Sequence, residues 1–83
     1  MDMRQVITER IQDAFADAKI TLTDMTGAGD HWNAVVVSEQ FEGMSRLQRQ
    51  RSVYAALGEL MHGPIHAMTF RTLTPEQYDM ENS

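Results

Sequence analysis

Apolar side chains recur every three or four residues along the first part of the chain, which is the period of a helix. Between residues 3 and 18 the charged side chains fall mainly on the opposite side of that helix. The apolar set comprises Met3, Val6, Ile7, Ile11, Ala14, Phe15 and Ala18. This pattern predicts an amphipathic helix over 3–18 with a single buried stripe.

A two-residue period follows the helix. Ile20 and Leu22 alternate with threonines, which predicts a short strand. Two glycines within residues 26–30 predict a turn or loop. The β-branched run over 32–38 predicts a second strand, and its successive valines favour burial on both faces. The two strands are expected to form an antiparallel hairpin with His31 in its loop.

A second helical pattern covers residues 46–61, with Ser45 as its N-cap. The apolar side chains expected to share a face of this helix are Leu47, Val53, Tyr54, Leu57, Leu60 and Met61. Gly63 and Pro64 end the helix. Alternation over 65–72 then predicts a third strand.

A short final helix is predicted after the third strand. Thr74 fits its N-cap, Pro75 its first turn and Gln77 the closing residue of a capping box. A strand–helix–strand connection within one sheet is right-handed, so the third strand should run parallel to the second. The expected order is α-β-β-α-β-α. The expected fold class is α+β, a three-stranded mixed sheet with helices packed on one face.

The composition narrows the possible functions. The 83 residues are expected to form one domain, 1–83, with one small core and little room for an enclosed active site. No Ser-His-Asp set, phosphate-cradling glycine loop or hydrolytic carboxylate pair is recognisable, so we expect a protein that is not an enzyme. Twelve acidic residues against seven basic ones argue against nucleic-acid binding over the whole surface. The lack of a long apolar run or a signal-like N-terminus leads us to expect a soluble, cytoplasmic protein that does not enter membranes.

Three of the seven basic residues lie within six positions at the start of the second helix: Arg46, Arg49 and Arg51. No acidic residue interrupts positions 43–58. A local basic face can act within a Debye length even on an acidic chain. Three interpretations remain open: a solvated helix face, a docking face for an acidic partner, and a phosphate-contacting patch.

The chain has three histidines and no cysteine. His31 is either a solvated loop residue or a metal ligand, and His66 is either a core or rim residue or a ligand. His62 ends the second helix, where a protonated imidazole favours the helix dipole. A closed tetrahedral site needs four protein ligands and a catalytic zinc usually three, so a metal bound by two imidazoles must be shared with a partner. Histidine replacing thiolate on one iron of a two-iron cluster would be such a case.

Six short motifs follow one another along the chain. They are His31-Trp32, Val35-Val36-Val37-Ser38, Phe41-Glu42-Gly43, the run from Arg46 to Leu57, Ile65-His66-Ala67 and Thr74-Pro75. In this order they resemble the BolA family, and the likeness runs from about Ile7 to Tyr78. The resemblance implies a class II KH-like fold, in agreement with the expected element order.

The same resemblance implies an accessory role in iron–sulfur cluster assembly, trafficking and iron homeostasis. Members pair with a monothiol glutaredoxin around a bridging [2Fe–2S] cluster, with glutathione among the ligands. The histidine of the Ile-His-Ala motif is the family's usual cluster ligand, which implies His66. The second ligand, Cys or His, usually lies in the hairpin loop about four residues before the aromatic residue, where this chain has Ala28. We therefore expect His31 to substitute; a cluster held by one ligand, or docking without a cluster, are the alternatives.

The family is also described as transcriptional regulators of the stress response that act on DNA. That alternative function would use the region from Phe41 to Arg51, with Gly43, Arg46 and Arg49 among its contacts. By itself the chain is expected to be a monomer or a weak homodimer without a cluster.

Overall fold

The computed structural model describes residues 2–63, 65 and 67–82. Its helices and strands follow the predicted order α-β-β-α-β-α. They are α1 (Met3–Ala14), β1 (Lys19–Asp24), β2 (His31–Val37), α2 (Arg46–Leu57), β3 (Ala67–Leu73) and α3 (Pro75–Glu81). Two short 3-10 helices flank α2: η1 (Glu39–Phe41) and η2 (Gly58–His62).

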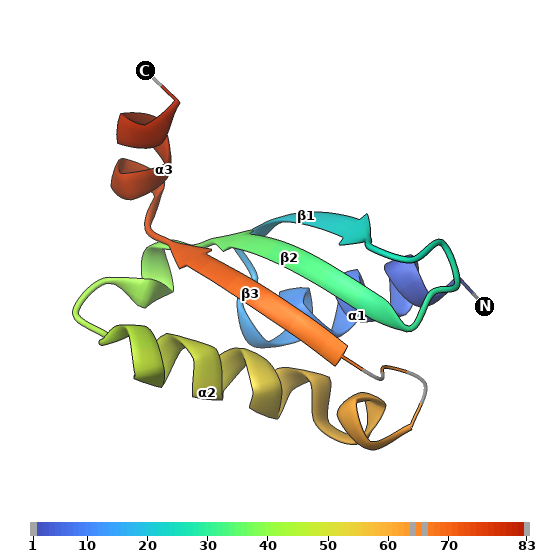
Figure 1. The fold of residues 1–83 in the computed structure, drawn as a ribbon. Helices are drawn as coiled ribbons and strands as arrows, with labels where there is room; N and C mark the ends of the chain where they lie inside the picture. The colour runs from blue at the N-terminus through green and yellow to red at the C-terminus, as the bar shows by residue number, and fades with distance from the viewer. Residues whose placement is uncertain (1, 64, 66, 83) are drawn as a thin grey trace.

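The three strands form one mixed sheet in the order β1-β2-β3. β1 runs antiparallel to β2, and β3 runs parallel to β2, as predicted from the crossover rule. The two long helices, α1 and α2, cover one face of this sheet (Figure 1). α3 is the exception to the expected layer, because it leaves the end of β3 away from both long helices and buries no residue. The expected α+β fold is confirmed.

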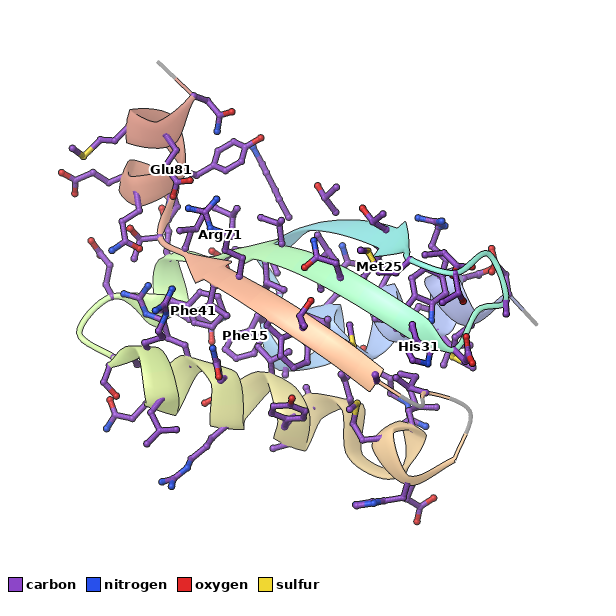
Figure 2. The ribbon with its side chains drawn as sticks, viewed as in Figure 1. Phe15, Met25, His31, Phe41, Arg71 and Glu81 are labelled. Atoms are coloured by element: carbon purple, nitrogen blue, oxygen red, sulfur yellow. The ribbon has the colours of Figure 1, made fainter. Side chains whose placement is uncertain are left out.

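The core lies between the sheet and the two long helices. Phe41 is fully buried and its ring centroid lies 5.0 Å from that of Phe15, so the two rings pack together (Figure 2). β2 contributes alternate side chains, Trp32, Ala34 and Val36, to the same core. The other core members include Ile7, Ile11, Leu22, Val53, Leu57, Ile65 and Met68.

The valine run of β2 is not buried on both faces throughout. Val35 points to the face without long helices and is only half-buried. Val37, which shares that face, is buried and lines a hollow with Pro75 and Tyr78. Burial on the second face therefore occurs only near α3.

α1 is shorter than the predicted helix over 3–18. It ends at Ala14, and the N–H of its C-cap Phe15 donates to Ile11 O. A turn follows, closed by a hydrogen bond from Ala18 N to Phe15 O (2.9 Å). Phe15 and Ala18 remain buried, so the apolar pattern continues into the turn after the helical backbone has ended.

α2 buries only part of the apolar face that was expected. Its buried residues are Val53 and Leu57, whereas Leu47 is 56% and Tyr54 42% exposed. At 3.6 residues per turn, Leu47 and Tyr54 lie about 100° around the helix from the buried stripe. The helix also ends earlier, at Leu57, where the chain turns into η2. Among the described residues, no helix has the length and apolar character needed to cross a membrane.

Candidate functional site

His31 is the first residue of β2 rather than a loop residue, which corrects the sequence-based placement. Met25 N donates to His31 O (2.8 Å), so the hairpin ladder continues one step beyond β1. On the other side His31 is in register with Ala67 of β3. Figure 2 shows His31 at this end of the sheet, and its side chain is 39% exposed. The imidazole is therefore accessible while its backbone is held by two neighbouring strands.

The segment that leads into His31 is fixed by the carboxylate of Asp24. Its Oδ1 accepts from Gly27 N (2.9 Å) and its Oδ2 from Gly29 N (3.0 Å). Trp32 Nε1 then donates to Gly29 O (2.9 Å). Ala28, the position at which the resemblance implied a ligand, is exposed and offers no ligating side-chain atom. The loop thus sets the start of β2 without contributing a donor at position 28.

The carboxylate of Asp30 lies close to His31, with its Oδ2 3.8 Å from Nε2. A carboxylate beside a ligating imidazole orients the ring and raises its basicity. Within residues 2–63, 65 and 67–82, no three His, Asp or Glu side chains gather in a way that could hold a metal ion. The described residues around His31 and Asp30 therefore do not form a complete ligand set.

His66, the first predicted ligand, lies outside the described residues. Its two sequence neighbours are described: Ile65 is in the core and Ala67 opens β3. The parallel register therefore pairs His31 with the residue that follows His66 in the chain. His62, expected at the end of the second helix, is instead exposed at the end of η2.

The three arginines do not form one free basic patch. Arg49 Nε donates to Met44 O (3.1 Å), and its Nη1 donates to Thr72 O (3.2 Å) and Gln77 Oε1 (2.9 Å). Its guanidinium also lies 5.8 Å from the centre of the Phe41 ring. Arg49 therefore joins α2 to β3 and α3.

Arg46 and Arg51 are exposed and remain candidate contacts for a partner or a phosphate. Arg46 lines a hollow of about 350 Å³ between the start of α2, the end of β3 and α3. Both residues follow Ser45, which caps α2 through a complete capping box with Gln48.

Gly43 has a structural role in a type II turn. Met44 N donates to Phe41 O (3.1 Å), Glu42 has φ −61° and ψ 134°, and Gly43 has φ +79°. This turn type needs positive φ at its third residue, which favours glycine. The Phe-x-Gly motif is thereby explained by a buried ring followed by a left-handed turn residue.

Asp17 is an organising residue that the sequence pattern did not single out. Ser38 Oγ donates to its Oδ1 (2.6 Å) and Glu39 N donates to its Oδ2 (2.7 Å). The hydrogen bond from Ser38, followed by that from Glu39, lowers the pKa of this carboxyl below its ordinary value. In sequence Asp17 was one more acid on the solvent side of a helix, because its partners lie more than twenty residues away.

Comparison with known proteins agrees with this geometry. The family model described as BolA-like protein matches residues 4–77. Human BolA-like protein 1 is 49% identical over 57 residues, which are 69% of this chain and 41% of the human protein. The chain thus spans about two fifths of that relative's length. A Haemophilus influenzae relative named DNA-binding transcriptional regulator BolA is 27% identical over 89 aligned positions, covering 99% of this chain and 86% of the relative.

Two solved structures extend the likeness to three dimensions. A Bol-like protein from Babesia bovis has a TM-score of 0.82 and 35% identity, covering 95% of this chain and 92% of that protein. BolA1 from Arabidopsis thaliana has a TM-score of 0.85 and 26% identity, covering 93% and 96%. With the family model matched over nearly the whole chain and the fold shared with these structures, the chain belongs to the BolA-like family.

Proposed function

We propose that this chain is a non-enzymatic adaptor that pairs with a monothiol glutaredoxin and shares a [2Fe–2S] cluster with it. Its role would lie in iron–sulfur cluster assembly and iron homeostasis. One observation carries the proposal most directly. The accessible imidazole of His31 stands in register with the residue after His66, in a chain without cysteine.

The donor chemistry fits a shared cluster. A two-iron cluster takes four protein or thiol ligands, and two histidines can replace two thiolates on one of its irons. His31 and His66 would supply the nitrogen donors, and the glutaredoxin with glutathione would supply the sulfur donors. The Asp30 carboxylate, 3.8 Å from His31 Nε2, would help to orient that ring.

Reconstitution with purified components tests the ligand assignment. The chain, a monothiol glutaredoxin, glutathione, iron and sulfide are mixed, and visible absorption and circular dichroism are recorded. We expect His66→Ala to abolish the spectrum of the mixed complex, and His31→Ala to change its shape. His62→Ala is the matched control, since His62 is exposed at the end of η2, and should leave the spectrum intact. An unchanged spectrum for His66→Ala would show that the assignment is wrong.

The second candidate is a DNA-binding regulator acting through the region from Phe41 to Arg51. It is favoured by the name of the Haemophilus influenzae relative and by the exposure of Arg46 and Arg51. If these two arginines contact phosphates, replacing both with alanine should reduce the slope of log K against log salt by about 2. Fluorescence anisotropy with duplex DNA over a salt series measures that slope. Absence of binding at low salt would eliminate this candidate.

A further inference from the structure

The outer edge of β3 carries backbone groups that have no partner in the described part of the chain. Ala67 N donates to Asp30 O (3.1 Å) and Ser38 N donates to Leu73 O (3.0 Å). In a parallel ladder this means that the odd-numbered residues of β3 bond to β2. The N–H and C=O groups of Met68 and Phe70 therefore point the other way, where no strand follows β3.

Two arginines bind carbonyl oxygens on the outer edges of the sheet, but neither covers the backbone from Met68 to Phe70. Arg4 Nη1 donates to Leu22 O (2.6 Å) on the outer side of β1. Arg49 Nη1 donates to Thr72 O (3.2 Å) at the far end of β3. Side chains that occupy edge carbonyls limit strand addition. The backbone from Met68 to Phe70 is left without such cover among the described residues.

An apolar strip of α2 flanks the open stretch. The ring of Tyr54 packs edge-on against that of Phe70, with centroids 4.8 Å apart, yet it stays 42% exposed. Leu47, two turns earlier on the same side of the helix, is 56% exposed. Figure 1 shows α2 running along β3 on the helix-covered face. A strand added at this edge would find side-chain contacts as well as backbone partners.

The charge along this edge favours an acidic ligand. The hollow of about 350 Å³ at the end of β3 is lined by Arg46 and Arg49. Arg49 uses Nε and Nη1, so the donors on its Nη2 have no partner among the described residues. Glu81, which also lines the hollow, is already paired with Arg71. A carboxylate entering here would meet two guanidinium groups.

The spacing of the elements favours a single partner strand at the β3 edge over a second copy of this chain. Paired strands lie about 4.8 Å apart, whereas packed helices need about 8–10 Å. Because α2 packs Tyr54 against the edge strand itself, two copies paired edge to edge would bring their α2 helices closer than that. A partner segment without a helix beneath it meets no such conflict.

We propose that the β3 edge accepts an extended, acidic and apolar segment of a partner protein as a fourth strand of the sheet. Its backbone would pair with Met68 and Phe70, its apolar side chains would cover Tyr54 and Leu47, and a carboxylate would reach Arg46. This site uses neither histidine and needs no cluster, so it can fail or succeed independently of the proposed function.

A designed peptide tests the proposal on the full chain. The probe is an acetylated, amidated peptide of alternating valine and threonine with glutamates at both ends, so that the hollow is reached in either orientation. Titration into the ¹⁵N-labelled chain should shift the amide signals of Met68 and Phe70 and slow their hydrogen exchange at least about tenfold. Arg46→Glu should weaken binding about tenfold, and Lys19→Glu, the same charge change on β1, less than twofold.

Thr72→Pro provides a second variant, because its N–H points away from β2 and proline is tolerated on edge strands. Thr72→Pro should weaken peptide binding, while the other amide signals of the chain should show that the fold is intact. The proposal is overturned if the peptide protects β1 amides, if a lysine-ended version binds equally well, or if neither Met68 nor Phe70 responds at millimolar peptide. Protection of the same amides by oligothymidylate, with none from the peptide, would assign the edge to single-stranded nucleic acid instead.

Discussion

The carboxylate of Asp17 joins the turn after α1 to the junction between β2 and η1. It accepts from the fully buried Ser38 hydroxyl and from the N–H of Glu39, the first residue of η1. Ser38 Oγ in turn accepts from Gln40 N (3.1 Å), which caps η1. One exposed acid thus fixes two chain segments that are distant in sequence.

This arrangement predicts a pH dependence. The hydrogen bonds lower the pKa of Asp17 from its ordinary value of 3.8, so the stability they give is fully present above that value. It is lost as the pH falls through the lower pKa of the folded state. Asp17→Asn should therefore be less stable than wild type at pH 7 and show a flatter acid limb between about pH 5 and pH 2. Urea unfolding across this range measures both effects.

The exposed acid Asp13 supplies the control for that experiment. Asp13→Asn also removes one negative charge, from the last turn of α1, and should leave the acid limb as steep as in the wild type. Equal slopes for Asp17→Asn and wild type would contradict the account of Asp17.

Substitutions at Gly43 should change stability through the backbone conformation alone, because a side chain there would make no close contact. Its φ is +79°, and a Cβ built there meets nothing within 4 Å. Gly43→Ala should therefore destabilise the protein by about 1 kcal/mol through conformation alone. Gly43→Asn should cost less, because asparagine tolerates the left-handed region. Chemical denaturation of wild type, Gly43→Asn and Gly43→Ala measures their free energies of unfolding, which should fall in that order. If Gly43→Ala is as stable as wild type, the turn has relaxed to a conformation that alanine can adopt.

At the level of elements, Arg49 is the residue that holds α2 against the end of the sheet. A lysine cannot reproduce its three hydrogen bonds to Met44, Thr72 and Gln77. We expect Arg49→Lys to lower the free energy of unfolding by about 1–3 kcal/mol. Arg51→Lys, on an exposed position of the same helix, should change it by less than about 0.5 kcal/mol. Equal effects would mean that the Arg49 contacts contribute nothing to stability.

The local signals in the sequence predicted the elements well. The N-caps Ser45 and Thr74 and the capping box of Thr74 with Gln77 are confirmed, because such motifs depend on residues only three positions apart. The end of α1 was predicted wrongly, because the apolar period continues through a turn that is fixed by Ser38, 21 residues away. The buried stripe of α2 was predicted only in part: Val53 and Leu57 are buried, whereas Leu47 and Tyr54 fit the same helical pattern but are exposed.

The sequence identified candidate residues of the site better than it predicted where they lie in the fold. His31 was singled out by chemistry, but its place in β2 depends on pairing with Met25 and Ala67. Arg49 was grouped with two exposed neighbours, because its partners Thr72 and Gln77 lie 23 and 28 residues further along. The free edge of β3 had no local signal, since it follows from the order of strands in the sheet.

At the scale of the whole molecule, the two proposed sites lie at different parts of the sheet. His31 and Ala67 mark one end of the β2–β3 pair, and Val37 and Leu73 mark the other, six residues on and roughly 20 Å away. The His31 imidazole lies at the first end, and the hollow lined by Arg46 and Arg49 lies at the second. A partner that engages both would span the length of β3, whereas separate partners could bind together.

Nitrogen hyperfine spectroscopy tests the central claim most directly. The chain is labelled with ¹⁵N-histidine, mixed with unlabelled monothiol glutaredoxin, glutathione, iron and sulfide, and the reduced cluster is examined by electron–nuclear double resonance. We expect strong ¹⁵N coupling in the wild type, weakened in His31→Ala and absent in the double variant that also carries His66→Ala. A cluster that forms in the mixed complex without any ¹⁵N coupling would contradict the proposal that this chain supplies imidazole nitrogen to iron.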